Sequence, residues 1–99
     1  MLNVEKKSDA GKMTVALEGR LDTSTAPELE SQLNADLDGV TDLTFDFEKL
    51  EYISSAGLRV LLSTQKKMNE QGTMRVVNVN DAVMEIFEVT GFSTILTIE

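Results

Sequence analysis

Apolar and polar residues alternate along residues 12–18, and this alternation predicts a strand with one buried face. We expect a shorter strand around residues 2–6 to pair with it as a hairpin through residues 8–11. Gly19 follows the alternating stretch and is expected to end the second strand.

The apolar spacing changes to steps of three and four residues after residue 25, which predicts an amphipathic helix ending near Gly39. Thr25 and Glu28 have the spacing of a capping box, in which the threonine hydroxyl caps backbone N–H groups and the glutamate reaches back. Pro27 suits a first turn because its missing N–H would have no helical partner there. The apolar residues that carry the spacing are Ala26, Leu29, Leu33 and Leu37.

A second unit of strand and helix follows. Alternation over residues 43–48 predicts a strand, which residues 52–53 extend past a turn. Ser54 and Ser55 form a helix start signal, and helical spacing continues to about residue 70. Gly72 is expected to stop this helix.

The last part of the chain repeats the order. Residues 74–79 predict a strand, and Asn80 or Asp81 can cap a third helix. Gly91 stands where a left-handed residue would end that helix. Residues 94–98 predict a final strand.

Strands that alternate with helices pair in parallel through crossovers, so the order predicts an α/β fold with a mixed sheet of four to five strands and amphipathic helices. A length of 99 residues suits one domain over residues 1–99. The loop that leaves each strand toward a helix lies at the carboxyl edge of the sheet, where open α/β sheets hold their sites. Residues 20–25, 54–57 and 78–81 are therefore expected along one edge.

The composition argues against catalytic and metal chemistry. The chain has no Cys and no His, so it lacks the thiolate, the commonest general base and the commonest zinc ligand. A serine nucleophile would have no histidine to activate it, and no phosphate-loop, dinucleotide or calcium-loop motif occurs. We expect a protein that is not an enzyme and that uses no cofactor or metal.

The charge favours protein partners. Lys plus Arg total 9 against 17 Asp plus Glu, a net charge of -8, which repels nucleic acid and anionic membranes. Most of the acidic excess lies before residue 52, where it either steers a basic partner or keeps the protein in solution. No apolar run suits a membrane span or a signal peptide. We expect a cytoplasmic monomer.

Polar residues at the expected edge are the main candidates for function. Either Ser54 or Ser55 can cap the helix, and either can also offer a hydroxyl to a kinase. Gly57 allows close packing against a neighbouring loop, or close approach of a partner's backbone. Asp22 begins a polar cluster through Thr25 and is either an Asx-turn residue or an exposed carboxylate for a partner Arg or Lys.

Three segments together resemble a known family. Gly19-Arg-Leu-Asp22 precedes a Thr/Ser cluster, and Leu50-Glu-Tyr-Ile-Ser-Ser-Ala-Gly-Leu58 lies in the middle of the chain. The closing segment is Thr90-Gly-Phe-Ser-Thr-Ile-Leu96. This pattern resembles a STAS domain of the anti-sigma factor antagonist family over essentially the whole chain, and the Ser-Ala-Gly-Leu stretch is its most specific part.

The resemblance implies a STAS fold and a phosphorylation-controlled binding protein. Unphosphorylated, such a protein binds an anti-sigma factor and frees a sigma factor. The anti-sigma factor is usually a serine kinase that phosphorylates the antagonist, and a PP2C-type serine phosphatase reverses the reaction. Ser55 aligns with the phosphoacceptor, with Ser54 as the second choice. The partner-binding residues implied are Asp22, Thr23, Ser24, Thr25, Ser54, Ala56, Gly57, Leu58 and Arg59.

The chain departs from the family pattern beside the acceptor. The family often has Asp-Ser-Ser-Gly or Asp-Ser-Thr-Gly, whereas this chain has Ser54 before the acceptor and Ala56 after it. Some STAS domains are never phosphorylated and serve as scaffolds or as parts of transport systems. A non-switching adaptor is therefore the alternative to the phosphorylation switch.

Overall fold

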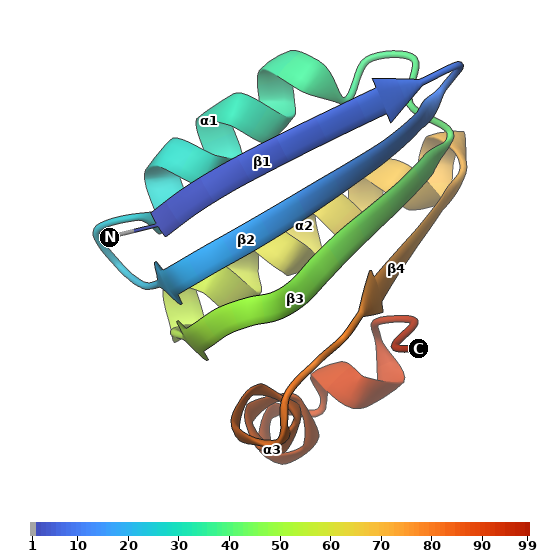
Figure 1. Cartoon of the computed structure of the whole chain (residues 1–99). Helices are drawn as coiled ribbons and strands as arrows, with labels where there is room; N and C mark the ends of the chain where they lie inside the picture. Colours follow the sequence, from blue (N-terminus) through green and yellow to red (C-terminus); the bar gives the residue numbers. More distant parts are fainter. Residues whose placement is uncertain (1) are drawn as a thin grey trace.

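Four strands form one sheet in the computed structural model, which describes residues 2–99, and three helices pack around it (Figure 1). The elements, in chain order, are β1 (Leu2–Asp9), β2 (Lys12–Leu21), α1 (Ala26–Asp36), β3 (Asp42–Ile53), α2 (Ser55–Gln71), β4 (Thr73–Val77), α3 (Asp81–Thr90) and a short 3-10 turn, η1 (Phe92–Thr94). The sequence therefore predicted the order of the seven main elements correctly.

The sheet is mixed, as predicted, with the strands in the order β1-β2-β3-β4. The hairpin strands β1 and β2 pair antiparallel, while β2–β3 and β3–β4 pair in parallel because a helix connects each pair. Both connecting helices, α1 and α2, lie behind the sheet in Figure 1, whereas α3 lies to one side, next to β3. Within residues 2–99, no helix covers the other face of the sheet.

The core lies between the sheet and the helices behind it, and three phenylalanines link it to α3. Phe45 and Phe47 point from β3 into the core, with ring centroids 5.9 Å apart. Phe87 of α3 lies 6.3 Å from Phe47, and all three side chains are fully buried. Burial of side chains this large stabilises each by about 1.5–3 kcal/mol relative to exposure, so Phe87 anchors α3 to the edge of the sheet.

β3 is continuous where the sequence predicted a turn. Its register against β2 shifts twice, so β3 contains two more residues than β2 over the same paired length. The buried residues of β3 consequently change from alternation to steps of three at Phe47, Leu50 and Ile53. Asp46 stabilises the first irregularity, because its side-chain oxygen accepts the backbone N–H of Glu48 at 3.0 Å. Bulges of this kind bend a strand without ending it.

The predicted end of β2 and the predicted final strand are both wrong. Gly19 does not end β2: it lies inside the strand with φ +105°, beside one of the register shifts, and pairing continues to Leu21. The final strand expected over residues 94–98 is also absent, since η1 occupies the beginning of that segment. Only Ile98 forms a parallel bridge, to Val76, so the described sheet has four strands.

The ends of α2 and α3 use glycine for different reasons. Gly91 is left-handed at φ +82°, as predicted, and ends α3. Gly72 follows α2 in extended backbone with φ 172°. A Cβ atom at Gly72 would lie 1.9 Å from the carbonyl oxygen of Thr41, so this position requires glycine for space. Within residues 2–99, no helix is long and apolar enough to cross a membrane.

Candidate functional site

Two of the three predicted loops meet at the carboxyl edge of the sheet. Leu21 and Ile53 are paired at the ends of β2 and β3, and the backbone N–H of Ser54 donates to the carbonyl of Leu21 at 2.9 Å. The segment that begins at Asp22 and the start of α2 are therefore neighbours. We define the switch edge as residues 22–25 together with residues 54–59.

The third loop lies beside β3 and short of its end. β4 stops at Val77, which pairs with Asp46, seven residues before the end of β3. Asn78 then takes a left-handed conformation with φ +59°, and Asn80 donates through its side-chain amide to the carbonyl of Leu50 at 2.7 Å. Asn80, one of the two residues predicted as its cap, also caps α3, because its side-chain oxygen accepts the N–H of Val83 at 2.9 Å.

Asp22 forms an Asx turn, one of its two predicted roles. Its Oδ1 accepts the hydroxyl of Ser24 at 2.7 Å, the backbone N–H of Ser24 at 3.0 Å and the backbone N–H of Thr25 at 3.2 Å. These donors, the Ser24 hydroxyl above all, lower the pKa of the Asp22 carboxyl below its ordinary value, against a smaller opposing effect of burial. The carboxylate is therefore held charged and fixed in orientation at the switch edge.

The capping box predicted at Thr25 and Glu28 is wrong. Thr25 has helical backbone angles (φ -100°, ψ -23°), and its side chain makes no capping hydrogen bond. It is buried instead, where its hydroxyl donates to the carbonyl of Arg20 at 2.9 Å and accepts the N–H of Asp22 at 2.8 Å. Thr25 thus closes the turn around Asp22, which the spacing of a capping box did not reveal.

Sequence reasoning missed the pair formed by Arg20 and Tyr52. The two residues are cross-strand partners on β2 and β3, and the guanidinium carbon of Arg20 lies 4.4 Å from the centre of the Tyr52 ring. The Arg20 Nε atom is also 3.9 Å from Oδ2 of Asp22. Because the bulges in β3 set this pairing, alternation alone could not have identified it. The pair holds the Arg20 cation in place beside the switch edge.

The two serines at the start of α2 have different environments. Ser54 is the N-cap residue, half-buried, and its hydroxyl oxygen accepts the N–H of Gly57 at a long 3.4 Å. Ser55 is the first residue of the helix and is exposed. Within residues 2–99, no hydrogen bond to the Ser55 hydroxyl is found. The structural role predicted for one serine therefore falls to Ser54, and the hydroxyl of Ser55 is accessible.

Gly57 is buried where α2 meets the strand ends. A Cβ atom there would lie 2.7 Å from Cγ of Leu21 and 2.8 Å from Cγ1 of Ile53, which is closer than van der Waals contact allows. Close packing therefore explains this glycine, although its neighbours are side chains at the ends of β2 and β3. The first turn of α2 therefore packs directly on the ends of β2 and β3, which are the strands that precede Asp22 and Ser55.

The residues predicted to bind a partner, taken together with the predicted phosphoacceptor Ser55, divide by exposure. Thr23, Ser24, Ser55 and Arg59 are exposed, and Asp22, Ser54 and Ala56 are half-buried. Thr25, Gly57 and Leu58 are buried. The three buried residues support the switch edge from inside the protein, and the exposed and half-buried residues form its surface.

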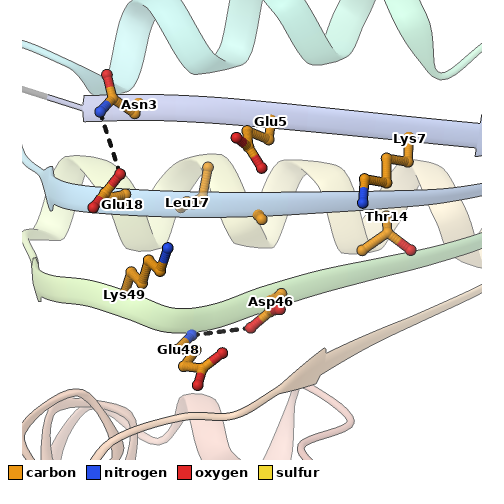
Figure 2. A pocket seen from close by; sticks show the side chains of 10 residues that line it. Asn3, Glu5, Lys7, Thr14, Leu17, Glu18, Asp46, Glu48 and Lys49 are labelled. Carbon is orange, nitrogen blue, oxygen red and sulfur yellow. Dashed lines mark hydrogen bonds between the residues drawn. The ribbon is translucent and has the colours of Figure 1, made fainter.

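A separate hollow lies on the open face of the sheet, away from Ser55. The depression has a volume of about 250 Å³. Its lining side chains come from β1, β2 and β3 (Figure 2). Charges of both signs alternate across it, with Glu5, Lys7, Glu18 and Lys49 among its lining residues. Among the described residues no group of three or more acidic side chains is placed to hold a metal ion.

Comparison with known proteins gives consistent results. The model of the family described as the STAS domain matches residues 1–99. BtrV of Bordetella bronchiseptica, which carries the name of an anti-sigma factor antagonist, is 36% identical over 90 residues, covering 89% of this chain and 78% of that protein. An anti-sigma-B factor antagonist of Staphylococcus aureus is 31% identical over 97 residues, covering 96% of this chain and 90% of its own length.

A solved structure agrees over almost the whole chain. The crystal structure of an anti-sigma factor antagonist from Mycobacterium paratuberculosis superposes with a TM-score of 0.89 and 25% sequence identity. The match covers 99% of this chain and 85% of that one.

Proposed function

This chain belongs to the STAS domain family and to its anti-sigma factor antagonists, and from that premise we propose that it binds an anti-sigma factor through the switch edge until Ser55 is phosphorylated. In the unphosphorylated form it occupies the anti-sigma factor and so releases a sigma factor. The anti-sigma factor is itself a serine kinase, and a PP2C-type phosphatase restores the unphosphorylated form.

The different environments of Ser54 and Ser55 carry the proposal. Ser54 is committed to the cap of α2, whereas Ser55 presents its hydroxyl to solvent one residue later. A kinase can therefore transfer the γ-phosphoryl group of ATP to Oγ of Ser55, with release of ADP and the hydroxyl proton, while the helix keeps its cap. Phosphorylation at Ser54 would instead modify the hydroxyl oxygen that caps α2.

Partner recognition begins from a fixed carboxylate. Ser24 and the turn already hold the Asp22 carboxylate in one orientation. Binding of a partner Arg or Lys therefore costs little conformational entropy of the Asp22 side chain. Thr23, Ser24, Ala56 and Arg59 contribute further polar and small side chains to the surface of the switch edge. The net charge of -8 further favours approach of a basic partner surface.

The switch needs no change of fold. A phosphoserine carries about two negative charges at neutral pH, and a partner seated on the switch edge would have to desolvate or oppose them. A penalty of about 3 kcal/mol weakens binding more than a hundredfold. Ser55 is already on the outside of α2, so the added charge acts directly on the docking surface.

We assign the chain a binding role with no catalysis, cofactor or metal of its own. It acts as a cytoplasmic monomer, one STAS domain over residues 1–99, with protein partners only. Its acidity supports the restriction to protein partners, since neither nucleic acid nor an anionic membrane attracts such a surface.

A non-switching adaptor is the second candidate, and Ser54 is the observation that favours it. The family often has Asp at this position, next to the acceptor. Ser54 instead caps α2, so this chain has no carboxylate immediately before Ser55. An adaptor would keep one stable complex whether or not Ser55 is modified.

Site mapping decides between these candidates. The purified chain is incubated with ATP and the serine kinase encoded nearest to it, and the intact mass and the modified residue are determined by mass spectrometry. The proposal predicts one phosphoryl group on Ser55 and none in Ser55→Ala. No addition by a kinase that is active on another antagonist would favour the adaptor, and addition at Ser54 would move the switch by one residue.

A further inference from the structure

Arg59 lies one helical turn after Ser55 on the exposed side of α2. The two residues are four apart, so they occupy the same face of the helix with Cβ atoms about 6 Å apart. Both side chains are exposed. Helical side chains lean toward the N-terminus, which directs a long residue at position 59 back over position 55. Arg59 can therefore reach a group attached to Ser55 without any movement of the backbone.

Nothing on α2 competes for this arginine. The helix neighbours of Arg59 at spacings of three and four are Ser55, Ala56, Leu62 and Ser63, none of which is acidic. The ion pairs found within residues 2–99 involve Lys6, Arg20 and Arg75, but not Arg59. In the unmodified protein the guanidinium is thus an uncommitted cation on the switch edge.

The second arginine near the switch edge is already engaged. Arg20 stacks on the ring of Tyr52 at 4.4 Å and lies 3.9 Å from the Asp22 carboxylate. A new anion at Ser55 would compete with both contacts for Arg20. Arg59 has no such contact to lose, and its planar guanidinium can donate two parallel hydrogen bonds to phosphate oxygens.

We propose that Arg59 pairs with the phosphate of phosphorylated Ser55. This inference deepens the proposed function, since it takes Ser55 as the phosphorylated residue. Phosphorylation then changes the switch edge twice over: it adds a dianion beside Asp22, and it removes the exposed Arg59 cation from the surface offered to a partner. A partner carboxylate that meets Arg59 in the unphosphorylated protein loses its contact when the phosphate arrives.

The second ionisation of the phosphoserine reports this pairing directly. An adjacent arginine stabilises the dianion over the monoanion and lowers the phosphate pKa from its usual value of about 6. Two other charged side chains lie in or next to the switch edge. Asp22 opposes this effect, and Arg20 is held by Tyr52. Both are unchanged in a comparison of variants at position 59.

The experiment uses the full chain with phosphoserine genetically encoded at position 55, so it depends on no kinase. The phosphorus NMR shift is titrated against pH in the wild-type sequence and in three variants. Arg59→Gln should raise the phosphate pKa by about 0.3 unit, as expected for one exposed ion pair on a helix. Arg59→Lys should restore part of the effect, because it keeps the charge but not the two-pronged geometry.

Lys66→Gln is the matched control. Lys66 is exposed on nearly the same stripe of α2, eleven residues from Ser55 and therefore about 16 Å away, beyond the screening length at physiological salt. The Lys66→Gln substitution removes one positive charge, as Arg59→Gln does, and should leave the phosphate pKa unchanged. Equal titration of the wild type and Arg59→Gln, or equal shifts in Arg59→Gln and Lys66→Gln, would overturn the pairing. The proposed function fails by a different result, namely that no kinase modifies Ser55 or that partner binding ignores the modification.

Discussion

The backbone N–H of Ser54 donates to the carbonyl of Leu21 at 2.9 Å, and this bond joins the two halves of the switch edge. The residue after Leu21 is Asp22, whose carboxylate is fixed by its own turn, and the residue after Ser54 is the exposed Ser55. The edge thus carries a fixed negative charge and a modifiable hydroxyl on two segments that this bond joins.

Ser54 and Ser55 should respond differently to removal of the hydroxyl. Ser54→Ala deletes the cap of α2 and should lower the free energy of unfolding by about 1 kcal/mol, while Ser55 remains a kinase substrate. Ser55→Ala removes no hydrogen bond known within residues 2–99 and should change stability by less than about 0.5 kcal/mol. Urea unfolding of both variants checks the difference, and equal losses of stability would contradict the assignment of the cap.

Gly57→Ala should destabilise the protein although alanine is the better helix former. The added methyl would lie within 2.8 Å of Leu21 and Ile53, and overpacking of this kind costs about 1–3 kcal/mol, more than the helix propensity returns. We expect a net loss of about 1 kcal/mol in chemical denaturation. Ser63→Ala, at an exposed position of the same helix, is the control and should leave stability equal or slightly raised. A stabilised Gly57→Ala protein would show that α2 is not seated on these strands.

Titration of Asp22 should report the Asx turn. Its pKa is expected below the ordinary value of 3.8, and Ser24→Ala should raise it by removing the largest favourable contact. Because the folded-state pKa is depressed, the contribution of Asp22 to stability is present above the unfolded-state value and is lost as pH falls through the folded-state value. The difference in stability between the wild type and Asp22→Asn should therefore shrink below about pH 4. Carboxyl NMR shifts measure the pKa, and an unshifted Asp22 would contradict the turn.

Much of this fold follows from local patterns in the sequence. Alternation identified β2 and the first half of β3, helical spacing identified α1 and α2, and the roles of Asn80 and Gly91 followed from capping preferences. The topology then brought Asp22 close to Ser55, because the carboxyl ends of neighbouring parallel strands share one edge.

The features that local patterns did not predict depend on contacts between distant segments. The bulges of β3 arise from its register against β2, so the sequence suggested a turn where the strand only bends. Thr25 turns inward to Arg20 because the Asp22 turn offers its hydroxyl two backbone partners, which outweighs a cap. The last segment contributes a single bridge, through Ile98, since η1 uses the residues that would have begun a strand. Burial of Gly57 likewise became evident only once Leu21 and Ile53 were placed beside it.

The affinity of the partner for the two forms of Ser55 shows whether phosphorylation switches binding. The chain with serine and the chain with encoded phosphoserine at position 55 are each titrated into the purified anti-sigma serine kinase encoded nearest to it, by calorimetry at fixed salt. The account predicts tight binding of the serine form and a dissociation constant at least about 100-fold higher for the phosphoserine form. Dissociation constants that agree within about twofold would contradict the switch and identify the chain as a non-switching adaptor.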